Sequence, residues 1–116
     1  MADDAPLNIE QLQGKAPGTL IVRFTGPVTL PNLFVFQSYL RGVSLPTVHI
    51  LDFSGVPYMD SAGMGATINH YVHCTKNGVR LIVTGVSSRV LELFKLTKMN
   101  TVMSLVATVE DAEASL

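Results

Sequence analysis

The sequence predicts one α/β domain with a mixed, mostly parallel sheet of four to five strands and about four helices packed on it. Three observations predict this class. The 116 residues fit a single domain, and 47% of them are hydrophobic, which is enough for one core. Short β-rich runs alternate with helical patterns along most of the chain. We therefore expect one domain over residues 1–116, with residues 1–7 flexible.

Turn-forming and helix-starting residues divide the first part of the chain into two strands and a helix, at residues 8–12, 19–24 and about 33–41. The glycine- and proline-rich residues 14–18 join the two strands, so these should pair antiparallel. Pro31 and Asn32 are typical of a helix start, and Gly42 is typical of a helix end.

From residue 48 onward the pattern alternates regularly between strand and helix. The predicted strands are residues 48–53, 80–84 and 101–106, and the predicted helices are residues 61–77, 87–96 and 109–116. Strands separated by helices pair in parallel through right-handed crossovers. The antiparallel beginning makes the whole sheet mixed.

Composition excludes several classes of function. Lys and Arg total 8 and Asp and Glu total 9, so the formal net charge of −1 leaves no electrostatic footprint for nucleic acid. Charged residues make up only 15%, against about 25% in typical domains, which indicates an apolar surface that meets a partner. The single cysteine, Cys74, excludes an internal disulfide. An acidic start containing Pro6, with no apolar run of ~20 residues, predicts a cytoplasmic protein without direct membrane insertion.

The most informative stretch is residues 51–65, which leaves a strand, turns, and begins a helix at Asp60 or Ser61. Either side chain can cap the helix by accepting an amide proton. Gly63 and Gly65 each disfavour the helix by about 1 kcal/mol relative to alanine, but they expose backbone to an anion or a protein surface. A phosphoryl group on Ser61 would be tolerated at this positive helix end and would alter any interface there. The simpler alternative is that Ser61 only caps the helix.

This stretch resembles the signature of the STAS domain (sulphate transporter and anti-sigma factor antagonist), specifically that of the bacterial anti-sigma factor antagonists. The residues that carry the resemblance form a strand end in Asp followed by Met-Asp-Ser-x-Gly-x-Gly: Asp52, Met59, Asp60, Ser61, Gly63, Met64 and Gly65. The resemblance continues through residues 78–83 and 90–94 and covers about residues 19–106.

The resemblance implies a phosphorylation-controlled partner switch that regulates transcription indirectly. Ser61 would be the phosphoacceptor, and Asp60, Gly63, Met64 and Gly65 would line the docking turn. The unphosphorylated form would bind an anti-sigma factor with a histidine-kinase-like ATPase fold, which acts as a serine kinase, and a serine phosphatase would reset the cycle. The chain itself would be no enzyme and would need no cofactor. The alternative is a non-enzymatic STAS subunit of a membrane transport complex or of a signalling scaffold.

Two features depart from this family pattern. Residues 26–29 read Gly-Pro-Val-Thr where the family often has Gly-Glu-Leu-Asp, so an expected acidic residue is missing. The helix at residues 33–41 carries one apolar stripe for the sheet and a second stripe that is harder to bury. The first stripe is Leu33, Phe34, Gln37 and Leu40, and the second is Phe36, Tyr39 and Val43. We expect the second stripe to pack under the amino-terminal segment, the alternative being contact with a second copy or another protein.

Three rival sites are predicted to be absent. His70, His73 and Cys74, with His49, could suggest a metal site, but no carboxylate accompanies them and structural zinc usually needs four ligands. We expect the histidines to face solvent, opposite a core face of Met64, Thr67, Ile68, Tyr71, Val72 and Thr75. Ser61 lacks the Gly-x-Ser-x-Gly setting of a hydrolase nucleophile, and residues 63–65 are too short for a nucleotide-binding loop.

Overall fold

The computed structural model describes residues 5–116, and the five strands in this range form one sheet in the order β1-β2-β3-β4-β5. The strands are β1 (Asn8–Gln13), β2 (Thr19–Thr25), β3 (Val48–Gly55), β4 (Arg80–Thr84) and β5 (Ser104–Val106). The helices are α1 (Leu33–Gly42), α2 (Ser61–Lys76), α3 (Ser88–Leu96) and α4 (Val109–Ala114), with short 3-10 turns η2 (Leu30–Asn32) and η3 (Met99–Thr101). β1 pairs antiparallel with β2, and all other pairs are parallel. The predicted fold class is confirmed.

The strand predicted at residues 101–106 is shorter than expected. The turn η3 takes up Met99–Thr101, and Lys98 before it adopts a left-handed conformation with φ of 62°. Only Ser104–Val106 pair with β4. An apolar run alone does not show which of its residues form the strand and which form the tight turn that follows the preceding helix.

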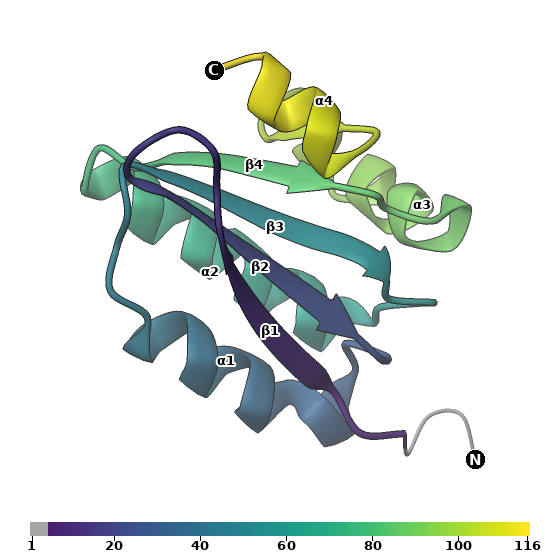
Figure 1. Cartoon of the computed structure of the whole chain (residues 1–116). Helices are drawn as coiled ribbons and strands as arrows, with labels where there is room; N and C mark the ends of the chain where they lie inside the picture. Colours follow the sequence, from purple (N-terminus) through teal and green to yellow (C-terminus); the bar gives the residue numbers. More distant parts are fainter. Residues whose placement is uncertain (1–4) are drawn as a thin grey trace.

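Helices cover the two faces of the sheet unequally. Figure 1 shows α1 and α2 side by side on one face, with α4 on the other. The α1 and α2 face, together with α3, buries the larger core, whose sheet residues include Val22, Leu51 and Val83. The opposite face buries a small cluster of Ile21, Ile50, Ile82 and the α4 residue Ala112. The alternation of side chains along each strand produces both cores, because successive residues point to opposite faces.

Away from α4, the second face is polar and carries two ion pairs of Arg23. Arg23 Nε lies 3.0 Å from Asp52 Oδ2, and Arg23 Nη1 lies 3.5 Å from Glu10 Oε1. Burial alone would raise the pKa of Asp52, but hydrogen bonds from Ser54 and the Arg23 guanidinium together hold it below its usual value. Asp52, which matches the family signature, therefore links β2 to β3.

The two stripes of α1 are arranged differently from the prediction. Phe36, placed on the second stripe, is fully buried, and its ring packs edge-on against Phe24 of β2 at a centroid distance of 5.1 Å. Tyr39 is half-buried, and its hydroxyl hydrogen-bonds Gln11 of β1. The expected cover by the amino-terminal segment is thus provided by the β1–β2 hairpin. Phe34, placed on the sheet-facing stripe, is instead 80% exposed.

The buried face of α2 also differs from the prediction. Met64 and Thr67 are buried as expected, whereas Val72 is exposed. The expectation that the histidines face solvent is wrong for His70, which is buried together with Cys74, and is right only for His73.

His70 and Cys74 of α2 are buried because β3 supplies a polar partner, His49, beneath them. His49 of β3 is fully buried, and its Nδ1 lies 3.0 Å from Nε2 of His70. The sulfur of Cys74 lies 3.4 Å from the same His70 nitrogen. A hydrogen-bonded cluster therefore occupies a place in the core that an apolar pattern would assign to aliphatic residues.

The segment before β1 is described from Ala5 onward, so residues 1–4 of the expected flexible start lie outside the described part. Leu7 is buried in the main core, and the carbonyl of Ala5 accepts a hydrogen bond of 2.8 Å from Asn32 Nδ2. Within residues 5–116 no helix combines the length and apolar character needed to cross a bilayer.

The arrangement of α1 gives a matched pair of variants. Phe36→Ala removes a fully buried ring and should reduce the free energy of unfolding by about 3–5 kcal/mol. Phe34→Ala removes an exposed ring from the same helix and should change it by no more than about 0.5 kcal/mol. Urea denaturation followed by circular dichroism measures both values. Equal losses in the two variants would contradict this packing.

The buried histidines predict a pH dependence of stability. Burial first, then the neighbouring His70, lowers the pKa of His49 to about 4, and burial first, then His73, lowers that of His70 to about 4. The unfolded state therefore binds more protons than the folded state between about pH 6.5 and pH 4. As the pH is lowered from about 6.5 to about 4, we expect the free energy of unfolding to fall by up to about 1.4 kcal/mol per pH unit for each histidine.

Denaturant titrations at half-unit pH intervals between about 7.5 and 4 test this expectation, because this range covers roughly the pH at which imidazoles titrate. Asp52, whose pKa lies below its usual value, begins to lose its contribution only below about pH 5, at the lower end of this window. A stability that stays flat down to the lower end of the window would show that neither imidazole is buried in its neutral form.

Candidate functional site

The beginning of α2 is fixed by the carboxylate of Asp60. One oxygen, Oδ1, accepts a hydrogen bond of 3.0 Å from the amide of Gly63, which caps the helix. The other oxygen, Oδ2, accepts one of 2.8 Å from the amide of Leu30 in η2. Of the two caps that the sequence left open, the structure uses Asp60. The same side chain ties the start of α2 to the loop before α1.

Backbone contacts strengthen this tie. The amide of Val28 donates to the carbonyl of Tyr58 at 3.2 Å, and the amide of Asp60 donates to the carbonyl of Val28 at 3.3 Å. A Cβ atom placed on Gly63 would lie 2.2 Å from the carbonyl oxygen of Val28. Only glycine lets the helix approach this closely. Gly63 is therefore buried and shapes the site from inside.

The structure separates the remaining predicted site residues into exposed and buried ones. Ser61, the first residue of α2, is exposed, and Asp60 is half-exposed. Gly65 is exposed, and a Cβ atom added there would meet nothing within 4 Å. Met64 is 1% exposed and packs into the main core. The outer surface of the turn therefore consists of Asp60, Ser61 and Gly65.

A shallow groove of about 730 Å³ runs from this turn toward α3. Asp60, Met59 and Thr29 form one side of it, and α3 residues including Leu93 and Leu96 form the other. Arg89 at the start of α3 stacks over the ring of Tyr58, with its Cζ atom 4.8 Å from the ring centroid. The lining of the groove therefore combines apolar with charged side chains, which is a composition suited to a protein segment.

One exposed apolar side chain, Leu96, lines the groove, and Leu30 lies between the lining residues Thr29 and Pro31. Leu30 in η2 is 66% exposed and Leu96 at the end of α3 is 76% exposed. Phe34, one turn beyond Leu30, is exposed as well. Large apolar residues gathered at one end of a small domain mark an interaction surface. The sequence analysis predicted such a surface from the low charge but did not place it at these three residues, because each lies in a run that is typical of a core.

One sequence departure has a structural explanation. Thr29, at the position where the family often carries an acidic residue, is 6% exposed, and its hydroxyl has no hydrogen-bond partner among residues 5–116. The carboxylate that binds the η2 backbone here is that of Asp60. The loop therefore keeps its shape without an acidic residue of its own.

Comparisons with known proteins place this geometry in a family context. A family model of the STAS domain matches residues 13–112. An anti-sigma factor antagonist from Mycobacterium paratuberculosis has a TM-score of 0.84 and 17% sequence identity, with 94% of this chain and 92% of that chain covered. A sulfate transporter family protein from Wolinella succinogenes has a TM-score of 0.75 and 24% identity, with 84% of each chain covered.

A third similar structure is the anti-sigma factor antagonist SpoIIAA in its unphosphorylated form. Its TM-score is 0.66 at 14% identity, with 93% of this chain and 96% of that chain covered. These three likenesses lie below 25% identity and show a shared fold. The family match extends over most of the sheet and includes the helix start at Asp60 and Ser61. This chain belongs to the STAS domain family.

Proposed function

We propose that this protein is an anti-sigma factor antagonist that works as a phosphorylation-controlled partner switch. In its unphosphorylated state it binds an anti-sigma factor of the histidine-kinase-like ATPase type, which releases a sigma factor. Phosphorylation of Ser61 by that anti-sigma factor ends the binding, and a serine phosphatase restores it. The observation that carries the proposal is the exposed Ser61 hydroxyl at a rigid helix start beside an apolar groove.

The position of Ser61 suits a residue that is modified without damage to the fold. It is the first residue of α2, where the positive end of the helix dipole favours negative charge. Capping is carried out by Asp60, so the Ser61 hydroxyl is not needed to begin the helix. Phosphorylation can therefore change the surface while the domain stays folded.

The electrostatic setting explains why phosphate would end the binding. A phosphoryl group brings a charge of about −1.5 to −2 to a position next to the Asp60 carboxylate. Asp60 already uses both oxygens to hold the amides of Leu30 and Gly63. The added charge would have to be desolvated against a partner docked on the apolar groove. Burying such an uncompensated charge costs several kcal/mol.

In this proposal the chain acts by binding and needs no cofactor of its own, since ATP and magnesium belong to the kinase. The STAS fold is equally present in the sulfate transporter family protein from Wolinella succinogenes, so a subunit of a membrane transport complex is the second candidate. Experiments on the modification of Ser61 separate the two candidates, because a transport subunit does not require a modifiable Ser61.

The direct test of modification is intact-mass analysis of the protein purified from its native source, with and without a serine phosphatase. We expect a phosphatase-sensitive mass increment of one phosphate, mapped to Ser61 and missing in Ser61→Ala. Phosphate mapped to another residue would contradict the proposal. A transporter subunit that co-purifies in place of an ATPase would favour the second candidate.

The charge on Ser61 gives a binding prediction. Ser61→Ala should bind the co-purifying ATPase like the wild type and should keep its stability within about 0.5 kcal/mol, as is usual for exposed positions. Ser61→Asp should also fold, because the helix dipole favours the added carboxylate by about 0.3–1 kcal/mol. It should nevertheless bind at least roughly 100-fold more weakly, since about 3 kcal/mol of uncompensated charge burial corresponds to that factor. Isothermal titration measures the affinities.

Ser44→Asp is the matched control for this experiment. Ser44 is exposed in the loop between α1 and β3, at the end of the sheet away from the start of α2, and the substitution adds the same charge. It should leave the affinity unchanged. If Ser61→Asp binds as tightly as the wild type, Ser61 does not control the interface, and the proposed switch is wrong.

The two glycines of the α2 turn should respond in opposite ways. Gly65→Ala adds a methyl group in open space on a helix and should stabilise the fold by about 1 kcal/mol. The same methyl group stands on the proposed docking surface and should weaken partner binding. Gly63→Ala brings Cβ against the Val28 carbonyl and should destabilise the fold strongly. Thermal melts and titrations compare the three chains, and a Gly65→Ala variant that binds normally would remove Gly65 from the interface.

A further inference from the structure

We propose that His49, His70 and Cys74 form a buried binding site for a thiophilic metal ion of the zinc type. All three side chains are 0–4% exposed, and their ligand atoms lie within 4.8 Å of one another. His49 comes from β3, and the other two come from successive turns of α2. The sequence analysis predicted no metal site because no carboxylate accompanies these residues and structural zinc usually needs four ligands, and it placed the histidines of α2 on the solvent side.

Two of the three separations are close to those that zinc requires, and the third, between His49 and Cys74, lies within 4.8 Å. Zinc binds imidazole nitrogen at about 2.0 Å and thiolate sulfur at about 2.3 Å in a tetrahedron, which places two nitrogens about 3.3 Å apart and a nitrogen and sulfur about 3.5 Å apart. Here His49 Nδ1 and His70 Nε2 are 3.0 Å apart, and His70 Nε2 and Cys74 Sγ are 3.4 Å apart. Small side-chain rotations would therefore let one ion bind all three.

Hydrogen bonding alone leaves this cluster incompletely satisfied. A neutral imidazole nitrogen offers either one proton or one lone pair. Nε2 of His70 faces both His49 Nδ1 and Cys74 Sγ, so it cannot make a full hydrogen bond to both. A metal ion at the centre of the three atoms would accept a lone pair from each of them, so the atoms would no longer compete for the same hydrogen bond.

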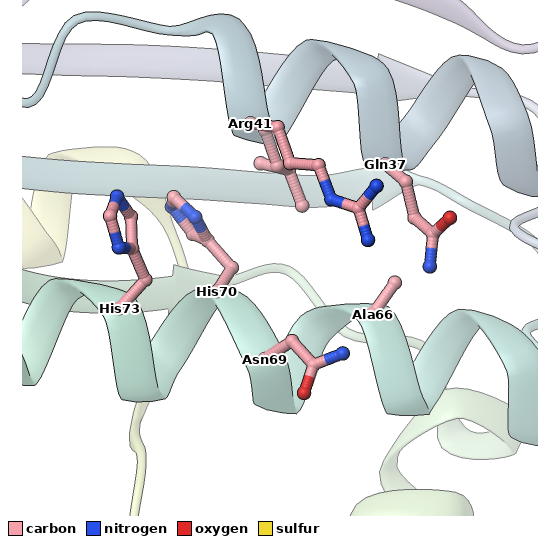
Figure 2. Close-up of a pocket in the computed structure, with 7 residues that line it drawn as sticks. Gln37, Arg41, Ala66, Asn69, His70 and His73 are labelled. Atoms are coloured by element: carbon pink, nitrogen blue, oxygen red, sulfur yellow. The ribbon is translucent and has the colours of Figure 1, made fainter.

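A cavity reaches His70, one member of the cluster. A cavity of about 270 Å³ between α1 and α2 is lined by His70, His73 and Arg41 among other residues. Figure 2 shows the His70 and His73 rings projecting from α2 toward α1, to one side of Arg41 and Gln37. A water molecule in this cavity could supply the fourth ligand, which would give the arrangement of three protein ligands and one open position that zinc adopts outside closed structural sites.

Binding has a simple proton balance. The Cys74 thiol loses its proton to solvent as the bond between sulfur and metal forms, and both imidazoles bind through neutral nitrogen. Both imidazoles are buried, which favours the neutral form that binds a metal. The lack of an acceptor for His49 Nε2 among residues 5–116 predicts weaker binding than in sites where each imidazole donates to a carboxylate.

The test uses the purified full-length chain with Co²⁺ as a spectroscopic probe and Zn²⁺ as competitor. We expect one Co²⁺ per chain, a thiolate-to-cobalt charge-transfer band in the near ultraviolet, loss of that band on addition of one equivalent of Zn²⁺, and a higher melting temperature with Zn²⁺. Absence of the charge-transfer band in the wild-type chain would overturn the proposal.

Variants identify the ligands. Cys74→Ser and His49→Gln should each lose more affinity than the roughly 10- to 100-fold that follows removal of a residue that only supports a ligand. His73→Gln is the matched control, because His73 is exposed on the same helix and lines the same cavity. Its affinity should equal that of the wild type, and a loss as large as that of Cys74→Ser would overturn the assignment. If a core variant does not fold, the wild-type cobalt spectrum decides the question.

Discussion

The close contact between the first turn of α2 and the loop at Val28 is the constraint on which the functional surface depends. Gly63 lets the helix approach the Val28 carbonyl, and both oxygens of Asp60 then join α2 to η2. This contact sets where Ser61 stands relative to Leu30 and the groove toward α3. A serine at the start of a helix is common, whereas a serine held beside a preformed apolar groove is specific to this arrangement.

A surface fixed in this way changes how modification can act. Because the turn is already ordered by hydrogen bonds to Asp60, little conformational entropy is lost when a partner docks. Phosphorylation of Ser61 would then act through charge on a rigid surface and needs no rearrangement of the helix. Such a switch would be expressed mainly in the dissociation rate of the complex, as most changes at a single interface are.

The order of elements and the site loop could be predicted because they depend on local signals. Alternation of strand and helix, turn glycines and the Asp60-Ser61 start all lie within short windows of sequence. The buried sides of α1 and α2 could not be predicted in the same way. Phe34 and Phe36 are equally apolar, and contacts with Phe24 of β2 and Phe53 of β3 decide which is covered. His70 is buried because His49 lies opposite it, 21 residues away, and no periodic pattern reveals that pairing.

The short helix α4 has a consequence for how the chain folds during synthesis. It covers Ile21, Ile50 and Ile82 on the second face of the sheet, and its Glu113 carboxylate accepts a hydrogen bond of 2.7 Å from the amide of Lys15, 98 residues earlier. Until residues 109–114 have left the ribosome, these isoleucines lack the cover that α4 provides. The nascent domain therefore exposes an aggregation-prone apolar sheet face for most of its synthesis. A chain stalled shortly before residue 109 would be expected to bind chaperones.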